Sequence, residues 1–190
     1  WGAIINFYKP LSTLINLLIC MQDKFFSGLK VVEFASVLAG PAVGMFFAEL
    51  GAEVIKIENK TTGGDVTRGW KHPSEAPESP ISAYWCAVNW GKEHLFLDLG
   101  NDADRRQAIE LASAADVVVS NFKPSSARRM GVDAEALRQQ NPRLIYAQLS
   151  SFADVEDESP AFDAILQAEA GFLYMNGEAE RQPVKMPVAL

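Results

Sequence analysis

Cysteine and histidine are scarce in this sequence, with two of each among 190 residues. Cys20 and Cys86 match no metal-binding or redox spacing. Neither His72 nor His94 sits in a His/Glu pattern that would bind zinc, so surface positions account for both. The sequence therefore predicts no metal site. A reducing compartment, the cytoplasm, is the simplest location for such a chain.

Positive charge is also in short supply, with 17 Lys and Arg against 24 Asp and Glu and a formal net charge of −7. Nucleic-acid binding needs a basic stripe, and none stands out, so the composition argues against nucleic acid as the main partner. A small basic pocket for a phosphate-bearing ligand is still compatible with it. The share of hydrophobic residues, 48%, is typical of a soluble globular protein.

A long hydrophobic run is missing from the N-terminal region. The most apolar stretch there, residues 11–20, is too short for a membrane span and contains several polar residues. Only Lys9 precedes it as a basic residue and no small-residue cleavage site follows, which argues against a signal peptide. Because the first methionine is Met21, we expect residues 1–27 to be an extension outside the fold. A peripheral helix and a true signal are the alternatives, and we expect no membrane association.

The C-terminal end lacks a helix cap or a polar tail. The segment ERQPVKMPVAL stops inside an extended run punctuated by proline. The length allows one substantial core and leaves little room for a second full domain. We therefore expect residues 28–190 to form the N-terminal part of one larger domain, truncated at its C-terminus.

Strand and helix signals alternate from Leu29 onward. Short β-branched or apolar runs predict strands at 30–34, 53–58, 93–99, 116–122 and 143–150. Helices are predicted at 38–52, 103–115, 125–131, 133–142 and 161–176. The alternation predicts an α/β fold with a doubly wound, Rossmann-like and mostly parallel sheet. The Gly-, Pro- and Ser-rich stretch 59–91 is long for a passive link, which favours a functional or partner-covered segment.

Ligands of a doubly wound fold bind at the C-terminal ends of its strands. After the first strand, Gly40 and Pro41 leave free backbone amides at a helix N-terminus, which suits an anion. Close packing of this helix on the sheet explains Gly40 and Gly44 equally well. Glu58 ends the second strand, where a dinucleotide fold holds a ribose hydroxyl, although G-x-G-x-x-G is missing. An NAD-binding oxidoreductase domain is therefore one alternative.

Two other segments carry candidate chemistry. In NFKPSSARR, residues 121–129, Phe122 could cover an adenine and the two arginines could hold a phosphate. A solvated helix explains this segment equally well. In GGDVTRGW, residues 63–70, Arg68 and the aromatic residue suit a loop that grips a ligand or a partner, and an exposed turn is the alternative. Asp163 is the visible candidate for a carboxylate nucleophile, but the helix dipole alone favours an acid at a helix start.

Five segments, taken together in their order and spacing, resemble the N-terminal part of the class III CoA-transferase family of the CaiB/BaiF type, which includes formyl-CoA and carnitine CoA-transferases. They are LKVVEFASVLAGPAVGMFFAELGAEVIKIE, GGDVTRGW, NWGKEHLFLDL, ADVVVSNFKPSSARRMG and NPRLIYAQLSSF. The resemblance implies an acyl-CoA transferase that moves CoA between carboxylic acids through an enzyme aspartyl intermediate. It also implies coenzyme A or acyl-CoA as a substrate, no permanently bound cofactor, and an interlocked homodimer.

The resemblance implies CoA-binding residues by position. By this resemblance, Val37 and Ala39 lie on the turn that contacts CoA. Leu97, Asn121, Phe122 and Arg129 match positions that line the nucleotide and its phosphates. Lys92 and Arg68 match recurring basic positions. The chain departs from formyl-CoA transferase at Asn59 and Gly100, where that enzyme has an arginine and a lysine. Lys60 is a possible substitute for the arginine.

The resemblance places the nucleophilic aspartate two positions beyond Leu190, so we expect the fragment itself to be inactive. Asp163 then matches a supporting acid. The α-methylacyl-CoA racemases of the same family have a histidine at the position of Phe162. Because a phenylalanine cannot shuttle a proton, this alternative is disfavoured.

Overall fold

The computed structural model describes residues 25–188 except 153, 155–157, 160–161 and 179. These residues form two compact units. That residues 28–190 are the N-terminal part of one larger domain stays a prediction. Unit 1 comprises residues 25–122 and 126–149, and unit 2 comprises residues 123–125 and the described residues from 150 onward.

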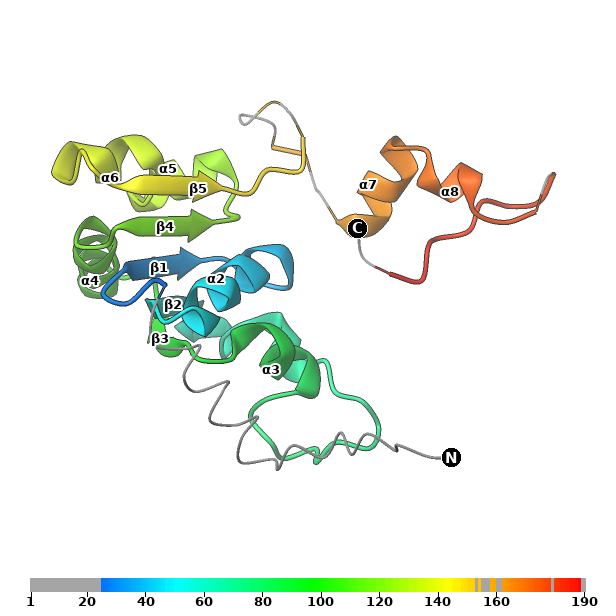
Figure 1. Ribbon diagram of the computed structural model, residues 1–190, viewed down its shortest axis with the longest axis horizontal. Helices are drawn as coiled ribbons and strands as arrows, with labels where there is room; N and C mark the ends of the chain where they lie inside the picture. Colours follow the sequence, from blue (N-terminus) through cyan, green and yellow to red (C-terminus); the bar gives the residue numbers. More distant parts are fainter. Residues whose placement is uncertain (1–24, 153, 155–157, 160–161, 179, 189–190) are drawn as a thin grey trace, which may run out of the picture. The chain divides into compact units, whose positions relative to one another are not determined.

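Unit 1 is built on a five-stranded sheet with the order β3-β2-β1-β4-β5 (Figure 1). Every neighbouring pair is parallel, so the mostly parallel sheet predicted from the sequence is entirely parallel. The five predicted strands are confirmed: β1 has the predicted bounds, β2 is one residue longer, and β3, β4 and β5 are shorter. Their bounds are β1 Lys30–Phe34, β2 Glu53–Asn59, β3 Glu93–Leu97, β4 Val117–Ser120 and β5 Ile145–Gln148.

Helices connect the strands, and some of them begin at side-chain caps. The Asn101 side chain accepts the N–H groups of Ala103 and Asp104 and thereby starts α4, and Asp133 starts α6 in the same way. The stretch 59–91 holds two short 3-10 helices and one α-helix. The bounds are α2 Ala39–Glu49, η1 Lys60–Thr62, η2 Val66–Gly69, α3 Ala83–Asn89, α4 Asp102–Ser113, α5 Pro124–Met130 and α6 Ala134–Gln140.

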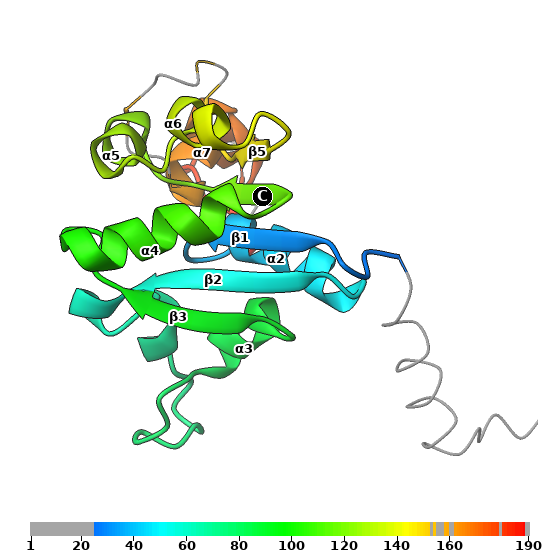
Figure 2. The same ribbon diagram turned by 90° about the vertical axis from the view of Figure 1, so that its left-hand side faces the viewer.

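Apolar side chains cover both faces of the sheet, as a doubly wound fold requires. On one face, Val32 and Val118 pack with Ala108 and Ala112 of α4. On the other face, Val31 belongs to a second cluster, which includes Val43 and Phe47 of α2. Figure 2 shows α4 and α2 on opposite sides of the sheet. The α/β, doubly wound fold class is thereby confirmed.

Packing of unit 1 begins slightly before the predicted boundary at residue 27. Phe26 packs in the cluster with Val43 and Phe47, and its N–H donates to the carbonyl of Leu50 at 2.9 Å. The predicted extension 1–27 therefore overlaps the fold at its last residues, and residues 1–24 lie outside those described.

Unit 2 contains two short helices, α7 (Asp163–Glu169) and α8 (Phe172–Met175). The sequence predicted one helix over 161–176. Gly171 separates the two, because its backbone is left-handed with φ 79°. Buried Gln167 ties the unit together, since its side chain bonds to Asp163, Val188 and Met186.

Across the described part of the chain, every helix falls short of the length or apolarity that a membrane crossing needs. In the same residues, no group of three or more His, Cys, Asp or Glu is arranged to hold a metal ion.

Candidate functional site

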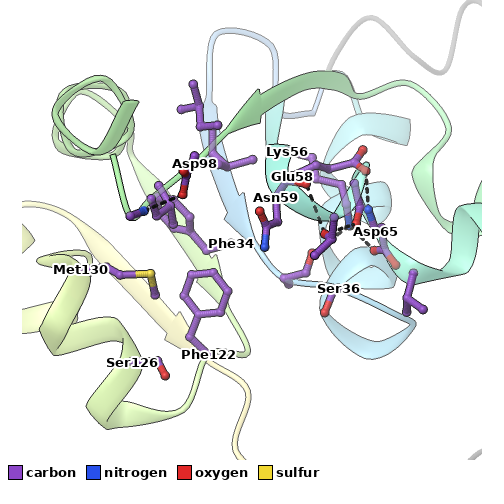
Figure 3. A pocket seen from close by; sticks show the side chains of 18 of the residues that line it. Phe34, Ser36, Lys56, Glu58, Asn59, Asp65, Asp98, Phe122, Ser126 and Met130 are labelled. Carbon is purple, nitrogen blue, oxygen red and sulfur yellow. Dashed lines mark hydrogen bonds and ion pairs between the residues drawn. The ribbon is translucent and has the colours of Figure 1, made fainter. Parts of the chain in front are cut away.

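A cavity of about 600 Å³ opens at the C-terminal ends of the strands in unit 1. The chain leaves β1 toward β2 and β3 on one side and reaches β4 on the other, so strand order reverses between β1 and β4. Ligands of open α/β sheets bind at such a switch point. The lining residues come from the ends of β1, β2 and β3, from the loop after β4, from η1, η2 and the loops beside them, and from α5 (Figure 3).

One side of the cavity is apolar. The rings of Phe34 and Phe122 lie 5.9 Å apart between centroids, tilted by 38°. Leu97 and Met130 extend this surface. Figure 3 shows Phe122 beside Met130 and Ser126. A flat aromatic base fits such a surface, because ring stacking and a polarisable thioether both favour contact with a π-face.

The polar rim near this surface carries charges of both signs. Arg129 lines the cavity and is exposed, so its guanidinium is available to an anion. Asp98 also lines it, and one of its carboxylate oxygens accepts the N–H of Gly100 at 2.9 Å. Arg129 is therefore the cation of the lining that we expect to contact a ligand phosphate.

Buried charges form the other side of the cavity. The Lys56 ammonium contacts Glu33 at 2.9 Å, Asp65 at 3.0 Å and the carbonyl of Ala35 at 2.8 Å. Its side chain is 1% exposed. The second carboxylate oxygen of Glu33 accepts a bond from Lys92 at 2.7 Å. Lys92, Glu33, Lys56 and Asp65 therefore form a chain of alternating charges, which we name the buried charge chain.

Lys92 lies at the inner end of this chain. Its ammonium also donates to the carbonyl of Pro41 at 2.7 Å and to the side chain of Asn89 at 3.2 Å. Burial lowers the pKa of Lys92 to about 8, although Glu33 acts in the opposite direction. The chain thus connects the end of β1 to the first turn of α2.

Glu58 is the centre of a second buried group. Its two carboxylate oxygens accept a two-pronged pair of bonds from Arg68 at 2.6 and 2.7 Å. They also contact His94 at 2.7 Å and the backbone N–H of Asp65 at 2.7 Å. Both oxygens are thus occupied inside the protein. The NAD-binding alternative needs a free acid at this position for the ribose, and Glu58 does not provide one.

The environment of Glu58 makes stability depend on pH. Burial alone would raise the pKa of this carboxyl, but the bonds from Arg68, His94 and Asp65 outweigh burial and hold the pKa well below its ordinary value of 4.5. A carboxyl whose pKa is lower in the folded state than in the unfolded state stabilises the fold above the unfolded-state pKa. This stabilisation is lost as the pH falls from the unfolded-state pKa toward the folded-state pKa.

We expect the free energy of unfolding of wild type and Glu58→Gln to differ most above pH 5 and to converge as the pH falls below about 4.5. Urea unfolding at several pH values, followed by tryptophan fluorescence, measures this. Trp85 is a suitable probe because the Arg68 guanidinium lies 4.0 Å from its ring centroid. A difference that stays constant from pH 6 to pH 3 would contradict the expected role of Glu58.

The turn between β1 and α2 borders the cavity through Ala35 and Ser36. The side chain of Asn121 accepts the N–H of Ser36 at 3.2 Å and donates to its carbonyl at 3.0 Å. Val37 has a left-handed backbone, with φ 73°. Its N–H donates to the carboxylate of Asp65 at 3.1 Å. The shape of this turn is therefore set by residues distant in sequence.

The structure distributes the predicted CoA-binding residues over three places. Leu97, Phe122 and Arg129 line the cavity. Val37 and Ala39 belong to the turn and the start of α2, and Asn121 bonds to that turn. Lys92 and Arg68 instead point into the buried groups around Glu33 and Glu58. The CoA contacts of all these residues stay predictions.

The residues at the departures from formyl-CoA transferase, Asn59 and Gly100, both line the cavity. Lys60, the possible substitute for the missing arginine, is exposed and lies 3.9 Å from Asp104. In unit 2, Phe162 precedes α7 and is exposed, and Asp163 lies 3.1 Å from Lys185. The supporting role of Asp163 stays a prediction.

The sequence analysis missed Lys56, Asp65 and Met130 as lining residues. One signal was available for Lys56, because a lysine inside the apolar strand EVIKIE needs a buried partner. Nothing local to residue 65 indicates that it bonds to Val37.

Comparison with known proteins identifies the family. Residues 26–190 match the sequence profile of "CoA-transferase family III". The chain belongs to this family. The resemblance drawn from the five sequence segments is thereby confirmed.

Curated CoA-transferases are similar to this member of family III. The chain is 40% identical over 169 residues to succinate–glutarate CoA-transferase of Agrobacterium fabrum, which covers 86% of the chain and 42% of that protein. It is 38% identical over 167 residues to succinyl-CoA:mesaconate CoA-transferase of Haloarcula hispanica, covering 83% of the chain and 41% of that protein. The chain thus spans about two fifths of the length of these relatives.

A solved structure supports the same assignment. The crystal structure of a CAIB/BAIF family protein from Brucella suis superposes with a TM-score of 0.76 at 36% identity. The match covers 86% of this chain and 43% of the Brucella chain. The fold of family III is therefore shared over most of the described residues.

Proposed function

We propose that this chain is the CoA-binding part of an acyl-CoA transferase, which moves CoA from the thioester of one carboxylic acid to another. The observation that carries the proposal is the cavity at the switch point of the sheet. It combines the apolar surface around Phe122 with the exposed cation of Arg129. The relatives are named for succinate, glutarate, succinyl-CoA and mesaconate, and these names support a carboxylic acid as the second substrate.

In the proposed complex the adenine lies against Phe122 and Met130, with the buried ring of Phe34 behind Phe122, and a phosphate lies near Arg129. Stacking on the ring orients the nucleotide, and the guanidinium offsets the phosphate charge. The acidic residues Glu58 and Asp65 do not oppose this, because both are paired with cations inside the protein.

The proposed reaction uses an aspartate beyond Leu190, in the longer protein of which this chain would be the N-terminal fragment. Its carboxylate oxygen attacks the thioester carbonyl carbon, the carbon–sulfur bond breaks, and CoA leaves as a thiolate. The thiolate then attacks the aspartyl carbonyl of the resulting mixed anhydride, which gives an enzyme thioester and releases the first acid as its carboxylate. The carboxylate of the second acid attacks this thioester and displaces the CoA thiolate. The thiolate finally attacks the acyl carbonyl of the second anhydride, which gives the new acyl-CoA and frees the aspartate. The chain in hand supplies CoA binding and is expected to be inactive by itself.

The proposal includes a homodimeric, cytoplasmic enzyme. Exposed apolar side chains of unit 2 support a partner surface, among them Phe162, Tyr174 and Met175. The reducing location rests on the scarcity of cysteine.

We expect the protein to bind CoA and not NAD in isothermal titration calorimetry. Phe122→Ala should weaken CoA binding about tenfold, because loss of base stacking on one aromatic ring costs roughly 1–3 kcal/mol. Arg129→Ala should weaken it by a similar factor, because a charge-assisted hydrogen bond is worth about 1.5–3 kcal/mol.

Arg143→Ala is the matched control for Arg129→Ala. Arg143 is also exposed, and it precedes β5, so it lies at the N-terminal ends of the strands, away from the cavity at their C-terminal ends. Its removal should leave the CoA affinity unchanged. Binding of NAD without CoA would refute the proposed ligand, and equal losses in Arg129→Ala and Arg143→Ala would refute the proposed site.

A further inference from the structure

We propose that Lys56 and Asp65 are positioning residues that hold the β1–α2 turn, residues 35–38, in the conformation that binds the ligand of the cavity. The inference rests on the proposed function for the identity of that ligand, CoA. It concerns residues that contact the turn and are not themselves required to react.

The turn is strained at Val37. A β-branched residue with φ 73° is an uncommon conformation, and such positions cost about 1–3 kcal/mol. A strained backbone of this kind persists only when the surrounding contacts determine it, and it concentrates at ligand-binding sites. Something other than the local sequence must therefore stabilise this conformation of the turn.

Side chains from three separate segments supply that stabilisation. Lys56 of β2 bonds to the carbonyl of Ala35 at 2.8 Å. Asn121, after β4, bonds to both backbone groups of Ser36. Asp65, at the start of η2, accepts the N–H of Val37. Three successive residues of the turn are thus bonded to side chains that lie 21 to 85 positions away.

Lys56 and Asp65 act as one group. Their charged atoms lie 3.0 Å apart, and each side chain is 1% exposed. Asp65 is itself fixed by the N–H of Thr67 at 3.1 Å and by its hydroxyl at 2.9 Å. A buried ion pair contributes little net stability compared with an apolar pair of the same size, and its best-attested effect is to specify one arrangement. Here the specified arrangement is that of the turn.

The turn, the ion pair and the cavity are contiguous. Ala35, Ser36, Lys56 and Asp65 all line the cavity, and Figure 3 shows Ser36 next to the Lys56 and Asp65 side chains. The strained residue Val37 therefore directly follows the part of the turn that lines the cavity. A preset turn lowers the conformational entropy lost on binding.

The test uses Asp65→Asn, which keeps the shape of the side chain and removes its charge. We expect CoA affinity to fall about tenfold and the hydrogen exchange of the Val37 amide to accelerate about tenfold, because the neutral acceptor holds the strained turn less well. Asn141→Ala is the control. Asn141 bonds to the carbonyls of Ser113 and Ala115, so its loss should lower stability without changing either readout.

Val37→Gly separates positioning from a structural role. Glycine adopts positive φ about as readily as negative φ. The double variant Asp65→Asn with Val37→Gly should therefore bind CoA at least about threefold more tightly than Asp65→Asn alone. A role of Asp65 in stability alone would show no such recovery. If Asp65→Asn folds too poorly to assay, Val37→Gly is compared in Asp65→Asn with Lys56→Met. This background keeps the pair of Glu33 with Lys92, and the same recovery is expected.

The outcomes are distinguishable. A wild-type protein that does not bind CoA would refute the proposed function. An Asp65→Asn variant with wild-type affinity, a loss that Val37→Gly does not repair, or an unchanged exchange rate at Val37 would each overturn the positioning role, and the exchange rate can be measured without ligand.

Discussion

Lys56→Met is expected to lower the free energy of unfolding by about 3–5 kcal/mol, because it leaves Asp65 without its ion-pair cation and takes one of the two cations from Glu33. Glu33 and Asp65 are both buried, so water cannot solvate the carboxylates that remain. Urea unfolding of unit 1, followed by the fluorescence of its tryptophans, measures the loss.

Two comparison variants test this explanation. Lys56→Met with Asp65→Asn removes one charge of each sign and keeps the pair of Glu33 with Lys92. It should therefore be more stable than Lys56→Met alone. Lys60→Ala removes a lysine whose side chain is 64% exposed, and it should change stability by less than about 0.5 kcal/mol. A loss below about 1 kcal/mol in Lys56→Met would show that the buried carboxylates do not need this cation.

Gly44→Ala is expected to destabilise unit 1 by several kcal/mol, although alanine is favoured over glycine within a helix by about 1 kcal/mol. A Cβ at this position in α2 would collide with the carboxylate of Glu33 and would lie 3.1 Å from the Lys92 ammonium. Neither group can move without breaking the buried charge chain. The interpretation that Gly40 and Gly44 allow close packing is supported by the same geometry, since a Cβ on Gly40 would collide with Ala35.

Gly69→Ala is the matched control, because a Cβ on Gly69 would meet no atom within 4 Å. The change should be close to neutral. Thermal unfolding of the two variants side by side measures the difference, and a Gly44→Ala variant as stable as wild type would mean that α2 can move away from the sheet at little cost.

The sequence was a good guide to elements and a partial guide to the site. Local patterns place all five strands, since alternating or continuous apolar runs report burial directly. They overestimate the last helix, because the left-handed backbone of Gly171 ends the first of two short helices. At the site, Phe122 and Arg129 were found because they follow the buried strand β4, where ligands of this fold bind.

Patterns along the chain suffice for the α/β order of elements and for the end of the strands where the cavity lies, and the order and spacing of five segments suffice for the family. Which charges meet follows from the three-dimensional fold. Glu33 and Lys92 are 59 residues apart, and Val37 and Asp65 are 28 apart. Their contacts follow from the strand order and from the folding of the 59–91 segment against the sheet. Coulombic attraction acts through space, so a charge pattern along the chain does not reveal its partner.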